Sequence, residues 1–252
     1  MKLFRAIGLV IAVVLMFSGI SLANDDMSEE KETEEQRRRR VIQKMERHYD
    51  ERVEKFKEEN KSLKNIVFLG DSLTEGFDVE KHFPKRSVLN RGIVADHVGL
   101  GERGVLKRLD CSVFDCNPSH VFLLIGVNDL GDDHSPEAVE KIAECYHKIC
   151  KRITTKLPEV KLVLQSCLPT GRNYTHLNES IVSLNSRIMK IADEMDLDYI
   201  DLHSLMKDEN GELKDEITRE GLHLKPEAYD MWREALEPYL PPVMGTKRTG
   251  KS

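Results

Sequence analysis

One serine and one histidine stand where a hydrolytic reaction could use them. Ser72 follows the short apolar run 66–69 and the turn residues Gly70-Asp71. A serine at a sharp turn attacks a carbonyl carbon when a base accepts its proton, and the start of a helix beneath it favours the anion that develops. His223 has the side chain of such a base, and a nearby carboxylate such as Glu220 can fix its tautomer.

Three groups could bind the oxyanion that forms during acyl transfer. Gly92 carries no side chain, so its N–H can approach a substrate oxygen, and the Asn128 amide is a neutral donor. Together with the Ser72 N–H they make three donors, and the loss of one such donor typically costs about 10²–10³ in rate. Each motif alone is more typical of a turn or a cap, so it is their order at four strand or helix boundaries that indicates acyl transfer.

The ordered motifs resemble those of the SGNH hydrolase (GDSL esterase/lipase) superfamily over about residues 64–240. The matching blocks are Gly70-Asp71-Ser72-Leu73, Asn90-Arg91-Gly92-Ile93, Gly126-Val127-Asn128-Asp129 and Gly221-Leu222-His223. The resemblance implies an α/β, flavodoxin-like three-layer αβα sandwich with a five-stranded parallel sheet, and neither metal nor cofactor. It also implies that Ser72 is the nucleophile, that His223 is the general base, and that Ser72, Gly92 and Asn128 bind the oxyanion.

The sequence departs from the family pattern at Glu220, because the family usually has Asp three residues before the histidine. We expect Glu220 to orient His223, since an imidazolium that forms near a carboxylate is electrostatically favoured. The alternatives are a Ser–His dyad supported by a backbone carbonyl, or Asp215 as the carboxylate. His97, which follows the glycine block, either lines the pocket or is a surface histidine.

The segments around the motifs alternate between strand and helix patterns. Apolar runs without alternation are typical of strands that are covered on both faces in a parallel sheet, and ligands bind beyond the carboxyl ends of such strands. Helical patterns occupy about 136–157, 178–195 and 226–237. The candidate strands are 66–69, 87–90, 121–125, 162–164 and 199–200. The sequence therefore predicts an α/β fold with the motifs on one rim.

The two ends of the chain differ from this central part. Residues 1–23 are typical of a secretory signal peptide, which predicts a secreted or periplasmic protein without a stable membrane span after cleavage; an uncleaved anchor is the alternative. Residues 24–63 predict a charged amphipathic helix whose apolar stripe packs on the main domain or pairs two copies in a homo-oligomer. Residues 241–252 are expected to form a loose tail.

Export would place the cysteines in a compartment where disulfides can form, so their number and spacing matter. The chain has five cysteines, an odd number, so at least one lacks a partner within the chain. Cys111 and Cys116 flank a predicted loop and either pair or serve as small buried hydrophobes. Cys145 and Cys150 lie on one predicted helix with diverging side chains, so they cannot easily bond to each other.

Composition and the absence of an obvious lid insertion narrow the function. The formal net charge is −6, which argues against a nucleic-acid partner. The compact catalytic region favours a serine esterase that hydrolyses short-chain carboxylic esters through an acyl-enzyme, with O-acetyl groups on carbohydrate as the first choice. The alternatives are a lysophospholipase or other lipid esterase, a catalytically silent binding module, and a metal-dependent phosphoesterase, which would need a denser set of Asp and His ligands.

Overall fold

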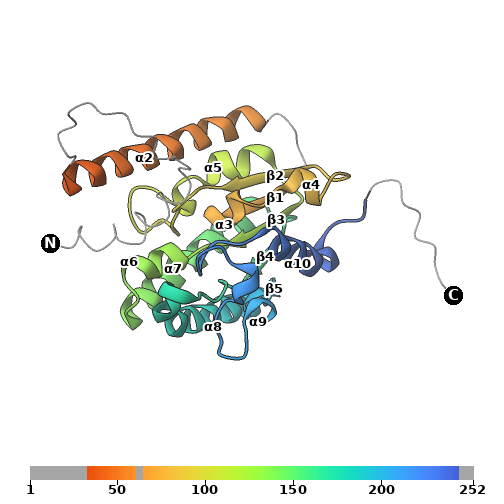
Figure 1. The fold of residues 1–252 in the computed structure, drawn as a ribbon. Coiled ribbons are helices and arrows are strands. Elements are labelled where there is room, and N and C mark those ends of the chain that lie inside the picture. The colour runs from red at the N-terminus through yellow and green to blue at the C-terminus, as the bar shows by residue number, and fades with distance from the viewer. Residues whose placement is uncertain (1–32, 61–64, 244–252) are drawn as a thin grey trace.

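A parallel five-stranded sheet in the order β2-β1-β3-β4-β5 forms the centre of the molecule (Figure 1). The structure is a computed structural model that describes residues 33–60 and 65–243. The strands are β1 (Ile66–Gly70), β2 (Val88–Gly92), β3 (His120–Leu124), β4 (Lys161–Gln165) and β5 (Asp198–Ile200). The predicted parallel sheet is confirmed, with the second strand extending two residues beyond the predicted 87–90.

The carboxyl ends of the three strands on the β2 side are level with one another. Gly70 at the end of β1 is paired in register with Gly92 of β2 and with Leu124 of β3. The chain leaves β1 between these two neighbours, and in sheets of this kind ligands bind where the strand order reverses. The residues that follow Gly70, Gly92 and Leu124 therefore gather at one rim.

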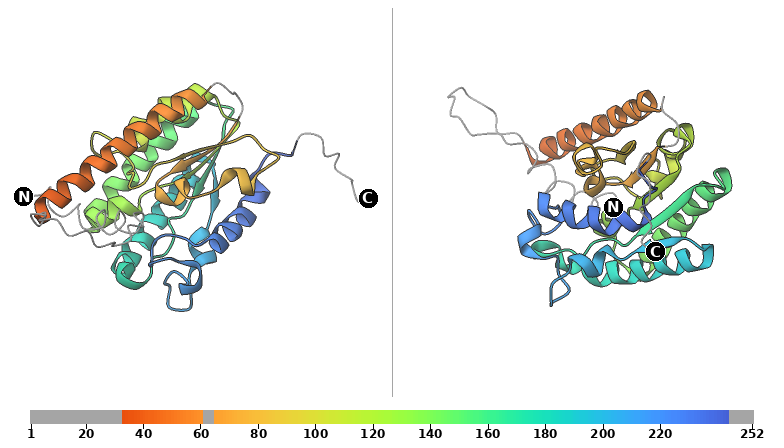
Figure 2. Two further views of the ribbon diagram at one scale, coloured as in Figure 1. Left: turned by 45° about the horizontal axis from the view of Figure 1, so that its top comes forward. Right: turned by 90° about the vertical axis from the view of Figure 1, so that its right-hand side faces the viewer.

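Helices cover both faces of the sheet (Figure 2). Val67, Leu69 and Leu123 face one apolar cluster with α5, α7 and α8, and the alternate residues Phe68 and Phe122 face a second cluster with α4, α9 and α10. Both sets of strand residues are buried, which explains why the strands read as unbroken apolar runs. The described helices are α2 (Glu34–Glu59), α3 (Ser72–Glu75), α4 (Val79–His82), α5 (Leu109–Ser112), α6 (Val127–Asp132), α7 (Pro136–Lys156), α8 (Asn178–Met195), α9 (Leu202–Met206) and α10 (Pro226–Leu236).

The helix predicted over 24–63 is observed as α2. It begins after Thr33, which forms a reciprocal capping box with Gln36, and it ends at Glu59. Its apolar stripe packs on the main domain, because Phe56 is fully buried and α2 lies alongside α5 (Figures 1 and 2). The sequence predicted that the stripe packs on the main domain or pairs two copies of the chain, and the structure shows the first arrangement for Phe56.

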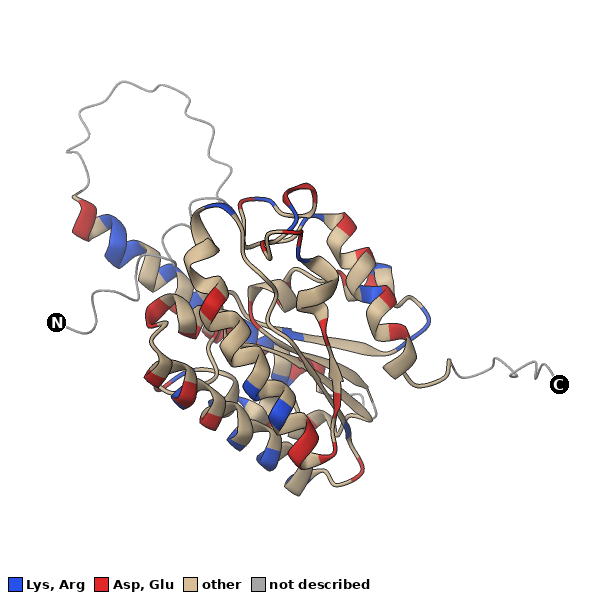
Figure 3. Cartoon of the chain, turned by 90° about the horizontal axis from the view of Figure 1, so that it is seen from below, with Lys and Arg blue, Asp and Glu red and all other residues tan. Residues whose placement is uncertain are grey.

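The charged side chains and the chain ends complete the picture. Figure 3 shows acidic and basic residues interspersed along the helices of the described part of the chain, the pattern of solvated helix faces. None of the helices described between residues 33 and 243 is long and apolar enough to cross a membrane. The predicted signal peptide, 1–23, lies outside the described residues. Arg86 donates a hydrogen bond to the carbonyl of Pro241, where the predicted tail begins, and 244–252 also lie outside.

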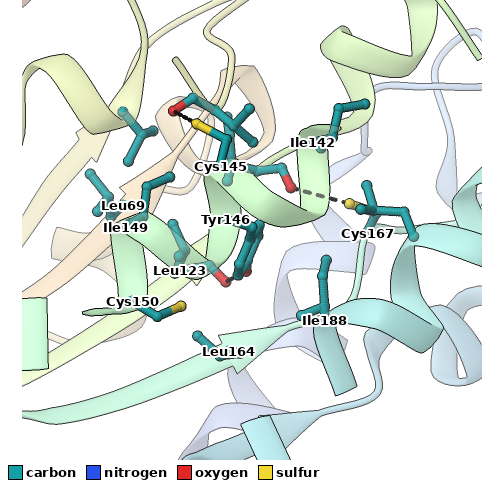
Figure 4. Close-up of a cluster of buried hydrophobic side chains, with 14 of the residues drawn as sticks. Leu69, Leu123, Ile142, Cys145, Tyr146, Ile149, Cys150, Leu164, Cys167 and Ile188 are labelled. Carbon is teal, nitrogen blue, oxygen red and sulfur yellow. Dashed lines mark hydrogen bonds between the residues drawn. The ribbon is translucent and has the colours of Figure 1, made fainter. Parts of the chain in front are cut away.

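The five cysteines are buried free thiols, so the Cys111–Cys116 disulfide that the sequence left open is not formed. The reason is local: the Cys111 thiol donates to the Arg108 carbonyl at 3.3 Å and the Cys116 thiol to the Val113 carbonyl at 3.2 Å, within consecutive short helical turns. Figure 4 shows Cys145, Cys150 and Cys167 among apolar side chains of α7, α8 and the sheet. Burial raises the pKa of Cys145 to about 11, which suppresses the reactive thiolate.

We expect the folded protein to react slowly with dithiobis(nitrobenzoic acid), because all five thiols are buried. Protein that is unfolded in guanidinium chloride without reductant should expose five thiols per chain and release five equivalents of thionitrobenzoate. The measurement is the absorbance of the released thionitrobenzoate. A titre below five in the unfolded protein would show that a disulfide is present and contradict the packing described here.

Candidate active site

Ser72 is the first residue of α3, directly beyond the carboxyl end of β1. Asp71 caps this helix, and its carboxylate accepts the Leu73 N–H at 3.0 Å. A Cβ at Gly70 would lie 2.2 Å from Thr74 Oγ1 and 2.3 Å from the Leu124 carbonyl oxygen, so only glycine permits the chain to turn here. The turn leaves the Ser72 side chain in a largely buried position at the rim.

His223 and Glu220 complete a line of hydrogen bonds that starts at Ser72. Ser72 Oγ lies 3.1 Å from His223 Nε2, and His223 Nδ1 is hydrogen-bonded to Glu220 Oε1. The same Glu220 oxygen accepts the His223 backbone N–H at 3.0 Å. Burial raises the pKa of Glu220, but these bonds and the charge of His223 outweigh burial and bring the pKa below its ordinary value. Glu220 is therefore held ionised against the ring.

The loop that carries His223 is closed by its own hydrogen bonds. Thr218 Oγ1 accepts the Gly221 N–H and donates to the His223 carbonyl, both at 2.9 Å. Gly221 has φ = 103° and its carbonyl accepts the Gly171 N–H at 2.7 Å, which ties the loop to the segment after β4. The other candidate carboxylate, Asp215, is exposed and paired with Arg172 at 2.7 Å. The structure thus brings Glu220 to the histidine and leaves Asp215 in a different ion pair.

The oxyanion donors are arranged differently from the sequence-based expectation. Asn128, near the start of α6, is buried, and its Nδ2 donates to the Asp96 carbonyl at 2.9 Å, which leaves the second amide hydrogen available. The Gly92 N–H, however, donates to Asn90 Oδ1 at 2.9 Å. This N–H is therefore occupied within the chain, and the expectation that it binds the substrate stays a prediction. Gly92 is needed for close packing, since a Cβ there would lie 2.1 Å from the Glu75 nitrogen.

Ala95 offers the donor that Gly92 does not. It lies in a turn in which the Asp96 N–H donates to the Ile93 carbonyl at 3.1 Å, and it has φ = 57°. Within the described residues, no hydrogen bond uses the N–H of Ala95 or of Ser72. The Asn128 amide donates to the carbonyl of Asp96, the residue after Ala95, so the turn lies beside Asn128. The sequence gives no signal for this role, since an alanine with positive φ is uncommon.

A buried ion pair fixes the turn to the nucleophile strand. The Arg108 guanidinium binds the Asp96 carboxylate at 2.7 and 2.8 Å and donates to the Gly70 carbonyl at 3.0 Å. Burial raises the pKa of Asp96, and Arg108 opposes that shift. Both side chains are only 2% exposed, so the pair is desolvated and depends on its good geometry.

A hollow of about 240 Å³ lies between α2 and the turn. Its apolar wall consists of Ile42, Met45, Tyr49 and Val94. His97 is at its polar side and lies 3.2 Å from the Asp132 carboxylate. Burial lowers the pKa of His97, but the bond to Asp132 and the charges of neighbouring carboxylates raise it to about 9. His97 is therefore charged at neutral pH. Of the two alternatives that the sequence left open for His97, the structure shows the one in which it lines a pocket.

Comparison with known proteins agrees with this combination of fold and site. A Ser–His–carboxylate arrangement at the carboxyl edge of the parallel sheet in an αβα sandwich is typical of a serine hydrolase. The profile of the GDSL-like Lipase/Acylhydrolase family matches residues 68–231, and the chain belongs to that family. No curated protein matches the sequence.

Solved structures have the same fold. One is a Streptococcus pneumonia protein named for platelet activating factor, with 25% identity, a TM-score of 0.73, and coverage of 82% of this chain and 99% of that one. A GDSL-like lipase from Bacteroides thetaiotaomicron shares 22% identity with a TM-score of 0.65, covering 74% and 96%. An acetyl xylan esterase shares 20% identity with a TM-score of 0.58, covering 70% and 100%.

Asp71 carries a pH dependence of stability that a single variant can isolate. Its side chain is fully buried with Oδ2 unpartnered, and burial raises its pKa from 3.8 to about 7. The folded state thus retains a proton that the unfolded state releases, so stability falls as pH rises from about 4 to about 7. Asp71→Asn keeps an oxygen for the Leu73 N–H and cannot ionise.

We therefore expect the stability difference between Asp71→Asn and the wild type to shift in favour of the variant as pH rises through this range. The expected size is about 1–4 kcal/mol. Urea unfolding at a series of pH values measures the difference. Asp129, whose pKa burial raises to about 6, titrates in both proteins and cancels. Parallel curves for the two proteins would contradict the assignment to Asp71.

Proposed function

We propose that the protein is a serine esterase that hydrolyses carboxylic esters through an acyl-enzyme on Ser72. The observation that carries the proposal is the unbroken line from the Ser72 hydroxyl through the His223 ring to the Glu220 carboxylate. Membership of an acylhydrolase family supports the same reaction class. A metal-dependent phosphoesterase has no support, because within the described residues no group of three or more His, Cys, Asp or Glu side chains could hold a metal.

We propose one role for each side chain. His223 Nε2 takes the proton from Ser72 Oγ as this oxygen bonds to the ester carbonyl carbon, and the imidazolium then protonates the departing alcohol oxygen. In the second half, His223 takes a proton from water, the hydroxide oxygen bonds to the acyl carbon, and the proton returns to Ser72 as the acid leaves. Glu220 holds the ring tautomer and stabilises its positive charge throughout.

The carbonyl oxygen becomes negative in both halves and needs donors. We assign this role to the N–H groups of Ser72 and Ala95 and to Nδ2 of Asn128. The support is that both N–H groups lack a partner in the described part of the chain, and that the Asn128 amide is fixed against the turn that contains Ala95. Donors that are already fixed in place stabilise the developing charge without reorganising.

The acyl group is proposed to occupy the hollow between α2 and the turn. Its volume of about 240 Å³ is below the range that is usual for drug-sized ligands, and one wall is apolar while Glu46, Arg103 and Asp132 line the polar side, which favours a short acyl chain. We rank O-acetyl esters of carbohydrate first. The acetyl xylan esterase among the structural neighbours is consistent with that choice, although at 20% identity it indicates the fold alone. Lipid esters are second, favoured by the apolar wall and by Leu100, which is 56% exposed.

We also propose that the protein is exported, to the periplasm or beyond the cell. The support is the sequence of residues 1–23, with Lys2 and Arg5 ahead of an apolar stretch and Ser21 and Ala23 as small residues at a cleavage site. Unpaired cysteines suit such a compartment when they are buried, because low exposure of the thiol slows its oxidation.

Replacing Ser72 with Ala tests the reaction. The variant should lose at least about 10³-fold in kcat on p-nitrophenyl acetate, since the nucleophile is absent. It should also lose labelling by a fluorophosphonate, which reacts with activated serines. Ser204→Ala, an exposed serine on α9, is the matched control and should retain both. Wild-type turnover by Ser72→Ala would refute the nucleophile, and an unlabelled, inactive wild type would favour a silent binding module.

A chain-length series tests the acyl site. With p-nitrophenyl acetate, butyrate, octanoate and palmitate, kcat/KM should be highest for the two short esters and about 10-fold or more lower for octanoate, because longer chains overfill the hollow. Met45→Ala enlarges the hollow and should raise the octanoate-to-acetate ratio about 5-fold or more. Met189→Ala, an exposed methionine on α8, is the control. A preference for palmitate, or an unchanged ratio in Met45→Ala, would contradict the assignment.

A further inference from the structure

Helix α2 lies outside the region that the family profile matches, yet it contacts the oxyanion segment directly. The profile covers 68–231 and α2 covers Glu34–Glu59. Arg52 of this helix donates to the Gly92 carbonyl at 2.9 and 3.2 Å and to the Asn90 carbonyl at 3.2 Å. The helix therefore holds the end of β2, immediately before the 93–96 turn.

Glu75, at the end of the nucleophile helix α3, joins α2 to the turn itself. Its Oε2 accepts the Val94 N–H at 2.6 Å. On the other side, His48 Nε2 lies 2.9 and 3.1 Å from the two carboxylate oxygens, and Arg52 Nε lies 3.7 Å from Oε1. Glu75 is only 19% exposed, so these charges act in a partly desolvated position. A hydrogen bond from an N–H to an ionised carboxylate is roughly twice as strong as one between neutral groups.

The register of α2 on the domain is fixed by its C-terminal end. Phe56 is fully buried, and the guanidinium groups of Arg52, Arg91 and Arg108 lie 4.9, 4.6 and 5.7 Å from its ring centre. The fully buried Arg91 side chain also forms an ion pair with Glu59. These contacts prevent the helix from sliding, so that His48 and Arg52 stay opposite Glu75.

The turn needs such support because of its backbone. Ala95 has φ = 57°, a conformation that costs a residue with a side chain about 1–2 kcal/mol. Val94 immediately precedes it, so the bond from the Val94 N–H to Glu75 fixes the peptide on the approach to the strained residue. The Val94 N–H lies in the 93–94 peptide, which adjoins the peptide that carries the Ala95 N–H, so we expect loss of the bond to let the 94–95 peptide rotate and redirect the Ala95 N–H.

We propose that α2 is a positioning element of the active site: His48 and Arg52, acting through Glu75, hold the 93–96 turn so that the Ala95 N–H faces the reacting carbonyl. This inference rests on the esterase function proposed above. Glu75 touches no reacting atom and is a positioning residue. Its effect falls on the transition states and tetrahedral intermediates, since the oxyanion is absent from the bound ester.

The test compares Glu75→Ala with Glu75→Gln on p-nitrophenyl acetate. Glu75→Ala should lower kcat about 10- to 100-fold with KM within about 3-fold, because a misplaced donor costs less than an absent one. Glu75→Gln keeps an oxygen for the Val94 N–H and should recover kcat to within about 5-fold of the wild type. Lys57→Ala removes an exposed ion pair with Glu54 on the same helix and is the matched control.

A second readout separates positioning from a general structural effect. A trifluoromethyl ketone forms a tetrahedral adduct on the serine with a negative oxygen, so its Ki should rise in Glu75→Ala by the same factor as kcat/KM falls. Fluorophosphonate titration of active sites corrects for any unfolded fraction. If Glu75→Ala fails to fold, Arg52→Leu retains the apolar packing on Phe56, removes the bonds to the Asn90 and Gly92 carbonyls, and should show the same paired change.

Three results would overturn the inference: wild-type kcat in folded Glu75→Ala, a fall in kcat with no change in the Ki of the ketone, or a Glu75→Gln variant as impaired as Glu75→Ala. Each of these presupposes an active wild type that is labelled at Ser72. A wild type with neither ester turnover nor labelling would instead refute the proposed function, and the inference with it. The two failures are therefore distinguished by the wild-type measurement alone.

Discussion

The hydrogen bond between the Ser72 hydroxyl and the His223 ring is the contact on which the site depends, because it joins residues 151 positions apart. No local structure brings them together. β1 carries Ser72 to the rim, and the loop closed by Thr218 and Gly221 carries His223 to the same place. The sheet and the helices packed on its two faces hold these elements at a fixed distance. The fold therefore places the hydroxyl next to the imidazole.

A second buried interaction couples the nucleophile to the groups that would receive the negative charge. Arg108 binds both the Asp96 carboxylate and the Gly70 carbonyl, so the turn and the end of β1 share one cation. Removing one partner of such a pair leaves an uncompensated buried charge, which typically costs about 3–5 kcal/mol. The strand and the turn are therefore fixed relative to each other by electrostatics as well as by packing.

The N-terminal helix extends this arrangement beyond the family region. A charged helix of mixed sign would usually be a solvated appendage, and most of the α2 surface is exposed. Several of its residues nevertheless face inward: Phe56 fills the space among the arginines, and His48 and Arg52 reach Glu75. The same helix forms the apolar wall of the small hollow, so one element contributes both to the shape of the site and to the order of its backbone.

The sequence alone determined the sheet and the four motif positions, because buried parallel strands must be apolar throughout and the turns at their ends require glycine. It also indicated Glu220 as a neighbour of His223, and the structure places that carboxylate against the ring, since the spacing is three residues within a short loop. It gave no signal that the Gly92 N–H is occupied within the chain or that the Ala95 N–H is left without a partner in the described residues. Asn90 Oδ1 accepts the Gly92 N–H. Glu75 and Arg108 bind the turn that contains Ala95 and so decide how its N–H is presented. Those partners come from distant segments, so only the tertiary structure decided where the donors lie.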